Sequence, residues 1–147
     1  MASSMAAVAV LCLCLWAALL RAGIEAACAS APDALGHLII SAAVPDAAYA
    51  DCKQLRSLYI AASVTALGGR AFDECTSLTH VTFAPDSLLA TTEPGAFHGA
   101  TSLLAFEVPP LVQVLSDNVF MGATLLSSVT FAQGTQLQTI GHDSFSY

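Results

Sequence analysis

Histidine is the residue type in this sequence best suited to metal binding or acid–base catalysis, and the chain has four of them. None has a Cys or His partner at the spacings that zinc sites use. Only two fall at equivalent positions of the repeat described below, and a separation of two coils, about 10 Å, is too large for one metal ion. We therefore predict no metal site. The histidines are His37, His80, His98 and His142, and the equivalent pair is His37 and His80.

The sequence contains no recognisable catalytic motif, although Ser, His and Asp all occur. It has no nucleophile elbow, no glycine-rich phosphate loop and no paired-carboxylate motif. The adjacent Gly68 and Gly69 lack the context of a phosphate cradle, and we assign them to a turn that requires a positive φ. The sequence thus predicts a protein that is not an enzyme and binds no cofactor.

Of the five cysteines, the three outside the apolar run of residues 6–20 could form disulfides if the protein is secreted. Cys52 and Cys75 occupy equivalent positions of adjacent repeats, at a spacing that a disulfide tolerates. The same position is filled by Ala100 and Ala123 in the next repeats, which favours small buried fillers and hence free thiols; a Cys52–Cys75 disulfide stays open. Cys28 lies at the end of an apolar N-terminal segment and is either removed with it or left unpaired.

The element that positions all these residues is a repeat, marked by an aromatic residue at intervals of 23, 25, 23 and 25 residues. A unit of this length indicates a stacked solenoid. A leucine follows six residues after each of the first four aromatics, and two alternating apolar residues follow the leucine, as in a strand with one buried face. The aromatics are Tyr49, Phe72, Phe97, Phe120 and Phe145, and the leucines are Leu55, Leu78, Leu103 and Leu126.

Two irregularities interrupt the repeat. Two extra residues follow every second strand, at Pro85-Asp86 and Gln133-Gly134, where they lengthen a surface turn and leave the inward positions in frame. Thr92 replaces an aliphatic residue five positions before an aromatic, and we expect it to be a weak point of the core.

The pattern Phe72, Cys75, Leu78, Val81, Phe83 resembles the BspA-like class of leucine-rich repeats, the type of treponemal and many protist surface proteins. Later units depart from it, for example at Pro109-Pro110 after a strand. The resemblance implies a solenoid of four to five coils of 23 to 25 residues, each with one short parallel β-strand and a convex side of short helical or irregular turns. It also implies a secreted or cell-surface protein that binds other proteins, often in adhesion, and it transfers no functional residue.

The N-terminal segment differs from the repeats. Residues 6–20 are apolar and uncharged, and small residues follow, so we predict a secretory signal peptide over 1–29, a linker over 30–36 and a repeat domain over 37–147 that is incomplete at its C-terminus. The first basic residue, Arg21, follows the apolar run, which leaves an uncleaved membrane anchor as the alternative. Membrane contact is expected only in that case, and the predicted location is secreted or cell surface.

The charge balance argues against one class of partner. Eleven acidic residues face four Lys and Arg, a formal net charge of -7. Nucleic-acid binding needs clustered basic side chains that contact phosphates. We therefore expect no nucleic-acid partner.

The remaining candidate site is the outward side of the strands, the concave face in leucine-rich repeats. Side chains there stand at fixed intervals on a rigid scaffold and suit an extracellular protein partner. Tyr59, His80 and Glu107 are the first residues to test. The alternative is a structural fragment of a larger repeat receptor or adhesin that self-associates through an uncapped C-terminal coil. The candidate face comprises Ile39, Ser57, Tyr59, His80, Thr82, Glu107, Ser128 and Thr130.

Overall fold

A computed structural model describes Cys28 and residues 31–147. Apart from Cys28, the predicted signal peptide lies outside the described residues. Within the described part of the chain, no helix combines the length and the apolar character that a membrane crossing would require.

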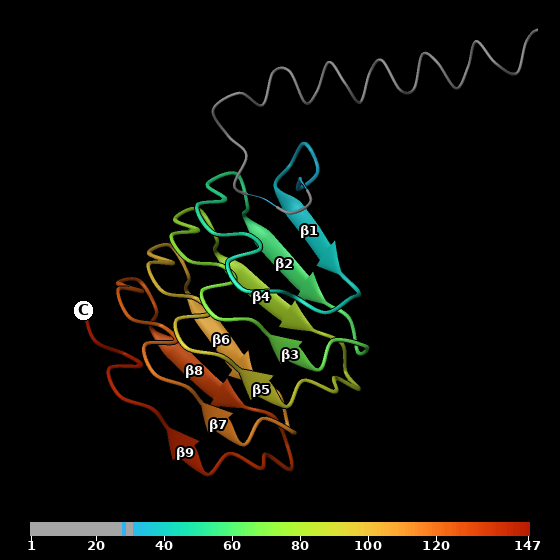
Figure 1. Cartoon of the computed structure of the whole chain (residues 1–147), viewed down its shortest axis with the longest axis vertical. Helices are drawn as coiled ribbons and strands as arrows, with labels where there is room; N and C mark the ends of the chain where they lie inside the picture. Colours follow the sequence, from blue (N-terminus) through green and yellow to red (C-terminus); the bar gives the residue numbers. More distant parts are fainter. Residues whose placement is uncertain (1–27, 29–30) are drawn as a thin grey trace, which may run out of the picture.

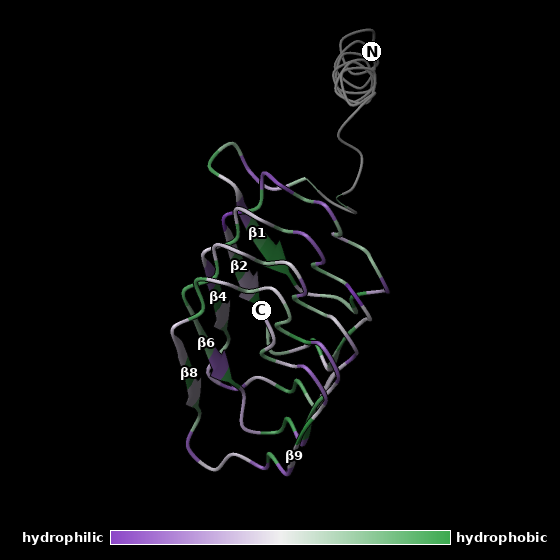
Figure 2. Ribbon diagram, turned by 90° about the vertical axis from the view of Figure 1, so that its left-hand side faces the viewer, coloured by the Kyte–Doolittle hydropathy of each residue, from purple (hydrophilic) through white to green (hydrophobic). Residues whose placement is uncertain are grey.

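The described residues form a solenoid of about five coils with two parallel sheets (Figure 1). The larger sheet has the strand order β1-β2-β4-β6-β8 and runs along one side of the stacked coils (Figure 2). Its strands are β1 (His37–Ile40), β2 (Ser57–Ile60), β4 (His80–Phe83), β6 (Ala105–Val108) and β8 (Ser128–Phe131). The solenoid and its parallel strands confirm the predicted fold class.

A second sheet, which the sequence did not predict, is formed by two-residue strands in the order β3-β5-β7-β9. Turns connect the two sheets. The prediction allowed these turns to be short helices or irregular, and the described residues contain no helix. The strands are β3 (Ala66–Leu67), β5 (Thr91–Thr92), β7 (Val114–Leu115) and β9 (Thr139–Ile140).

The coils are joined by backbone hydrogen bonds in the turns as well as in the sheets. At the start of each aromatic turn, the aromatic N–H donates to the carbonyl of the residue that precedes the next aromatic. A coil therefore satisfies its polar backbone on its neighbour rather than on itself. The bonds run from Tyr49 to Ala71 (2.8 Å), Phe72 to Ala96 (2.8 Å), Phe97 to Val119 (2.9 Å) and Phe120 to Ser144 (2.9 Å).

The aromatic column predicted from the spacing is the centre of the core. Successive rings from Tyr49 to Phe145 are 5.2 to 5.8 Å apart between centroids, with planes within 17° of parallel. Leu55, Leu78 and Leu103 are fully buried beside them. Thr92, the expected weak point, is also buried, and its hydroxyl donates a long hydrogen bond of 3.5 Å to the Val114 carbonyl.

The assignment of Gly68 and Gly69 to a positive φ is wrong. The left-handed residue in this turn is Arg70, with φ 52°. Gly68 is instead required by close packing of adjacent coils, because an added Cβ would lie 2.4 Å from the Pro45 carbonyl carbon. Each coil places its left-handed residues two positions before the aromatic and, in four coils, two positions after it. They are Ala47, Arg70, Gly95, Asn118 and Asp143 before, and Asp51, Glu74, Gly99 and Gly122 after.

We predict that Phe97→Ala lowers the free energy of unfolding by about 3–5 kcal/mol, because it empties a fully buried position in the column. Thr82→Ala, at an exposed strand position, should change it by less than about 0.5 kcal/mol. Chemical denaturation of both variants measures the difference. Small, equal effects would show that the register is wrong.

A second prediction separates the two adjacent glycines. Gly68→Ala should cost about 1–3 kcal/mol of stability, because its methyl group overlaps the backbone of the preceding coil. Gly69→Ala should be neutral or stabilise by up to about 1 kcal/mol, since its nearest contact is 3.6 Å away and alanine restricts the unfolded chain. Thermal unfolding of the pair is the measurement, and an equal loss in both variants would contradict the packing explanation.

Candidate functional site

The sheet register brings the predicted face together in two parallel rows. Pairing of Ile39 with Tyr59, Tyr59 with Thr82, and Glu107 with Thr130 builds one row. The pairs Ser57 with His80 and Ala105 with Ser128 belong to the neighbouring row. All the candidate side chains are exposed except that of Ser57, which is half-buried. The geometry groups these residues on one surface, and their role in binding stays a prediction.

The β1 end of this surface carries a local polar network. His37 Nδ1 is hydrogen bonded to the Ser57 hydroxyl, and Asp33 Oδ1 accepts the backbone N–H groups of Leu35 and His37. These bonds lower the pKa of Asp33, chiefly through the His37 N–H. The carboxylate therefore holds the turn before β1 through two backbone hydrogen bonds, while the His37 ring bonds to the Ser57 hydroxyl.

The candidate sheet is interrupted in its middle. The β4–β6 ladder contains only the pair His80 with Ala105, whereas the ladders on either side contain four pairs each. Three of the residues that follow a strand donate their N–H to the last strand residue of the preceding coil. These bonds run from Ala61 to Ile40 (2.9 Å), from Ala84 to Ile60 (2.9 Å) and from Ala132 to Val108 (3.1 Å).

The residue at the fourth equivalent position is Pro109, which has no N–H to donate to the Phe83 carbonyl. A small notch of about 90 Å³ opens beside this missing bond. Its polar side chains are Ser87 and Glu107. The apolar lining is Phe83, Ala84, Pro85, Pro109, Pro110 and Ala132.

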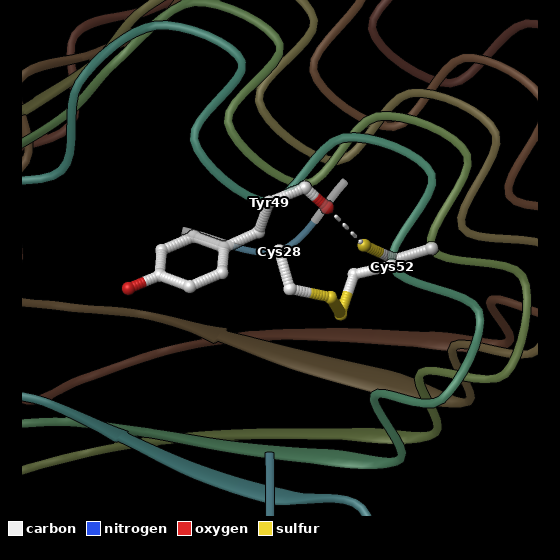
Figure 3. Close-up of a disulfide and its surroundings, with 4 residues drawn as sticks. Cys28, Tyr49 and Cys52 are labelled. Atoms are coloured by element: carbon white, nitrogen blue, oxygen red, sulfur yellow. Dashed lines mark hydrogen bonds between the residues drawn. A yellow bond between two sulfur atoms is a disulfide. The ribbon is translucent and has the colours of Figure 1, made fainter. Parts of the chain in front are cut away.

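The cysteines depart from the prediction. Cys28 forms a disulfide with Cys52, with the two Cα atoms 5.3 Å apart (Figure 3). The expectation that Cys28 is lost or unpaired, and that Cys52 is a free thiol, is therefore wrong. Cys28 stands 24 residues before Cys52, one repeat length, so it occupies the same column on top of the first coil. The repeat spacing itself was the signal that identifies the pair.

Cys75 is a free, buried thiol, as predicted for it. Its Sγ donates a hydrogen bond to the Tyr49 carbonyl at 3.1 Å. Burial raises the pKa of the Cys75 thiol to about 12, so the thiol stays protonated and unreactive at neutral pH. No disulfide joins Cys52 to Cys75.

One polar cluster was not anticipated. Asp73 and His98 each follow an aromatic directly, so stacking brings them together, with His98 Nδ1 2.6 Å from Asp73 Oδ1. Glu74 lies beside them, and ligand atoms of the three residues are within 4.8 Å of one another. Asp73 also faces Arg70 at 3.9 Å. The Asp73 carboxylate is thus already paired with two basic side chains. We interpret the cluster as a structural link between coils.

The second sheet has a shallow hollow of about 440 Å³ at its C-terminal end. Its carboxylates are Glu93 and Asp117, and Asp117 Oδ1 accepts the His142 backbone N–H at 2.7 Å. Val114 and Ile140 supply its exposed apolar surface. The hollow adjoins the last coil, whose inward positions are more exposed than those of earlier coils. Exposed fractions there are 49% for Phe131, 48% for Ile140 and 37% for Phe145.

Comparison with known proteins gives the following likenesses. The repeat family described as "BspA type Leucine rich repeat region" matches residues 42–147 in six copies. The structure of PcpA, a pneumococcal vaccine antigen, is similar over 62% of this chain and 22% of its own, with 23% identity and a TM-score of 0.58. A leucine-rich repeat protein from Bacteroides ovatus is similar over 78% of this chain and 37% of its own, with 21% identity and a TM-score of 0.62.

At these identities the solved structures show a shared fold alone. The chain spans 22% and 37% of the two proteins, well under two thirds of either. A search among curated proteins finds no match.

We predict that Cys28→Ala lowers the free energy of unfolding by about 3 kcal/mol, the value expected for opening a loop of this length. A reducing agent should destabilise the original protein by a similar amount and leave the variant unchanged. Denaturation with and without dithiothreitol measures both effects. Equal sensitivity of the two proteins to the reductant would contradict the assigned pairing.

Proposed function

The chain belongs to the BspA-type leucine-rich repeat family, and on this basis we propose that it is a non-enzymatic, secreted or cell-surface module that binds an extracellular protein, in adhesion or recognition. The binding surface is the outward face of the β1-β2-β4-β6-β8 sheet, defined by the eight candidate residues named above. The observation that carries the proposal is their grouping in two in-register rows. Side chains fixed on a sheet lose little entropy when a partner binds.

Secretion is supported by the disulfide, since disulfides persist mainly in oxidising compartments. The predicted boundary after residue 29 would remove Cys28. We therefore place cleavage of the signal peptide before Cys28, so that the mature protein retains the disulfide.

A second candidate function is self-association through the last coil. It is favoured by the exposure of Phe131, Ile140 and Phe145, whose counterparts Val108, Leu115 and Phe120 are buried. Sedimentation at several concentrations tests this alternative. A monomer at every concentration would count against it.

The binding proposal predicts that Tyr59→Ala, His80→Ala and Glu107→Ala together reduce capture of extracellular protein partners at least about tenfold, because they remove the exposed centre of the face. The matched control carries Thr91→Ala, Val114→Ala and Thr139→Ala, exposed positions on the second sheet. Quantitative pull-down compares the two variants with the original protein. Unchanged capture by the first variant would exclude this face as the binding surface. A separate activity test uses a panel of esterase, protease and glycosidase substrates, and turnover of any of them would overturn the non-enzymatic assignment.

A further inference from the structure

The notch between β4 and β6 contains two hydrogen-bond acceptors without donors. The Phe83 carbonyl lacks the bond that Ile40, Ile60 and Val108 receive at the equivalent position. The exposed Glu107 carboxylate makes no ion pair or hydrogen bond to any other residue in the described part of the chain. Pro109 is the cause of the unpaired carbonyl, because a residue with an N–H at this position would use the carbonyl and continue the ladder.

The notch therefore favours a ligand rich in donors. A carboxylate and a carbonyl are both pure acceptors, so a ligand with a single hydroxyl would leave one of them unmatched, and the Glu107 charge would repel an anionic ligand. Apart from the Ser87 hydroxyl, which accepts the Leu89 N–H, the remaining lining is apolar, which suits a hydrocarbon stem. The formal net charge of -7 adds a general attraction for cations. Together these features select a cationic side chain with an aliphatic stem.

The size of the notch restricts the ligand further. A volume of about 90 Å³ is well below the roughly 300–1,000 Å³ of pockets that enclose a small molecule, so the notch suits the end of one side chain and not a peptide segment. Arginine fits the two separate acceptors better than lysine, because its planar guanidinium presents five N–H donors in a fixed fork.

We propose that this notch is a recognition site for an arginine side chain of the protein partner. The guanidinium donates to the Glu107 carboxylate and to the Phe83 carbonyl, and its methylene stem packs against Pro109 and Pro110. The inference rests on the proposed function, since the notch lies at the ends of β4 and β6 and shares Glu107 with the candidate face, and it specifies which chemistry on the partner that face selects.

The test uses N-acetylarginine amide as the probe and NMR spectroscopy of the ¹⁵N-labelled, disulfide-bonded protein. We expect saturable shifts at the amides of Phe83, Glu107 and Ala132. Glu107→Gln should weaken binding at least about fivefold, because it removes the charge and keeps the shape. Glu93→Gln, a carboxylate on the other side of the solenoid, is the matched control and should bind as the original does. Equal binding of the neutral N-acetylcitrulline amide, tighter binding of N-acetyllysine amide, or an unaffected Glu107→Gln variant would overturn the assignment.

Pro109→Ala tests the backbone acceptor separately. The variant supplies an N–H to the Phe83 carbonyl, so the amide of residue 109 should be protected from hydrogen exchange and arginine binding should fall. Protection without any loss of binding would remove the carbonyl from the site and overturn the two-acceptor geometry.

Partner capture distinguishes this inference from the proposed function. Reduced capture by Glu107→Gln alone supports the arginine site. If capture falls with Tyr59→Ala and His80→Ala but not with Glu107→Gln, the notch assignment fails and the sheet-face proposal stands. If neither change reduces capture, the sheet-face proposal itself fails.

Discussion

The structure depends on one constraint, that the polar backbone of each coil is satisfied by the next coil. Strand ladders supply these bonds in both sheets, and the aromatic turns continue them between the sheets. Since a one-residue slip would break the bonds and turn inward side chains outward, every coil must place equivalent residues at equivalent points. The aromatic and leucine columns follow from this requirement. So do the paired left-handed residues on either side of the first four aromatics.

Much of the fold could be predicted from the sequence because columns of bulky residues repeat visibly. Phe72, Leu78 and Val81 mark inward positions within a single repeat unit, even when that unit is not compared with the others. The second sheet left no such mark, since strands of two residues such as Thr91–Thr92 are too short to show alternation. The left-handed positions were equally hidden, because Ala47 and Glu74 occupy conformations that sequence reasoning assigns to glycine.

The candidate site was predictable in outline and not in detail. Alternation along the strands identifies the outward rows, so Tyr59 and Glu107 could be placed on one face from the sequence. The proline after β6 was visible as a departure from the repeat, yet its consequence depends on the register, which shows that the missing donor belongs opposite the Phe83 carbonyl. Cys28 was misassigned for a different reason, because its neighbourhood resembles a cleavage site more strongly than it resembles a repeat.

The Cys28–Cys52 disulfide gives the solenoid a mechanical polarity. Its first coil is fastened by this covalent bond, whereas the coils from β4 to β9 are held together by packing and hydrogen bonds, with no disulfide among the described residues that form them. In a stack where each coil contacts only its neighbours, loss of structure spreads from the least supported coil. Loss of structure would therefore start in the coils that no covalent bond crosses, and the candidate rows would come apart last near Ile39, which lies inside the loop that the disulfide closes.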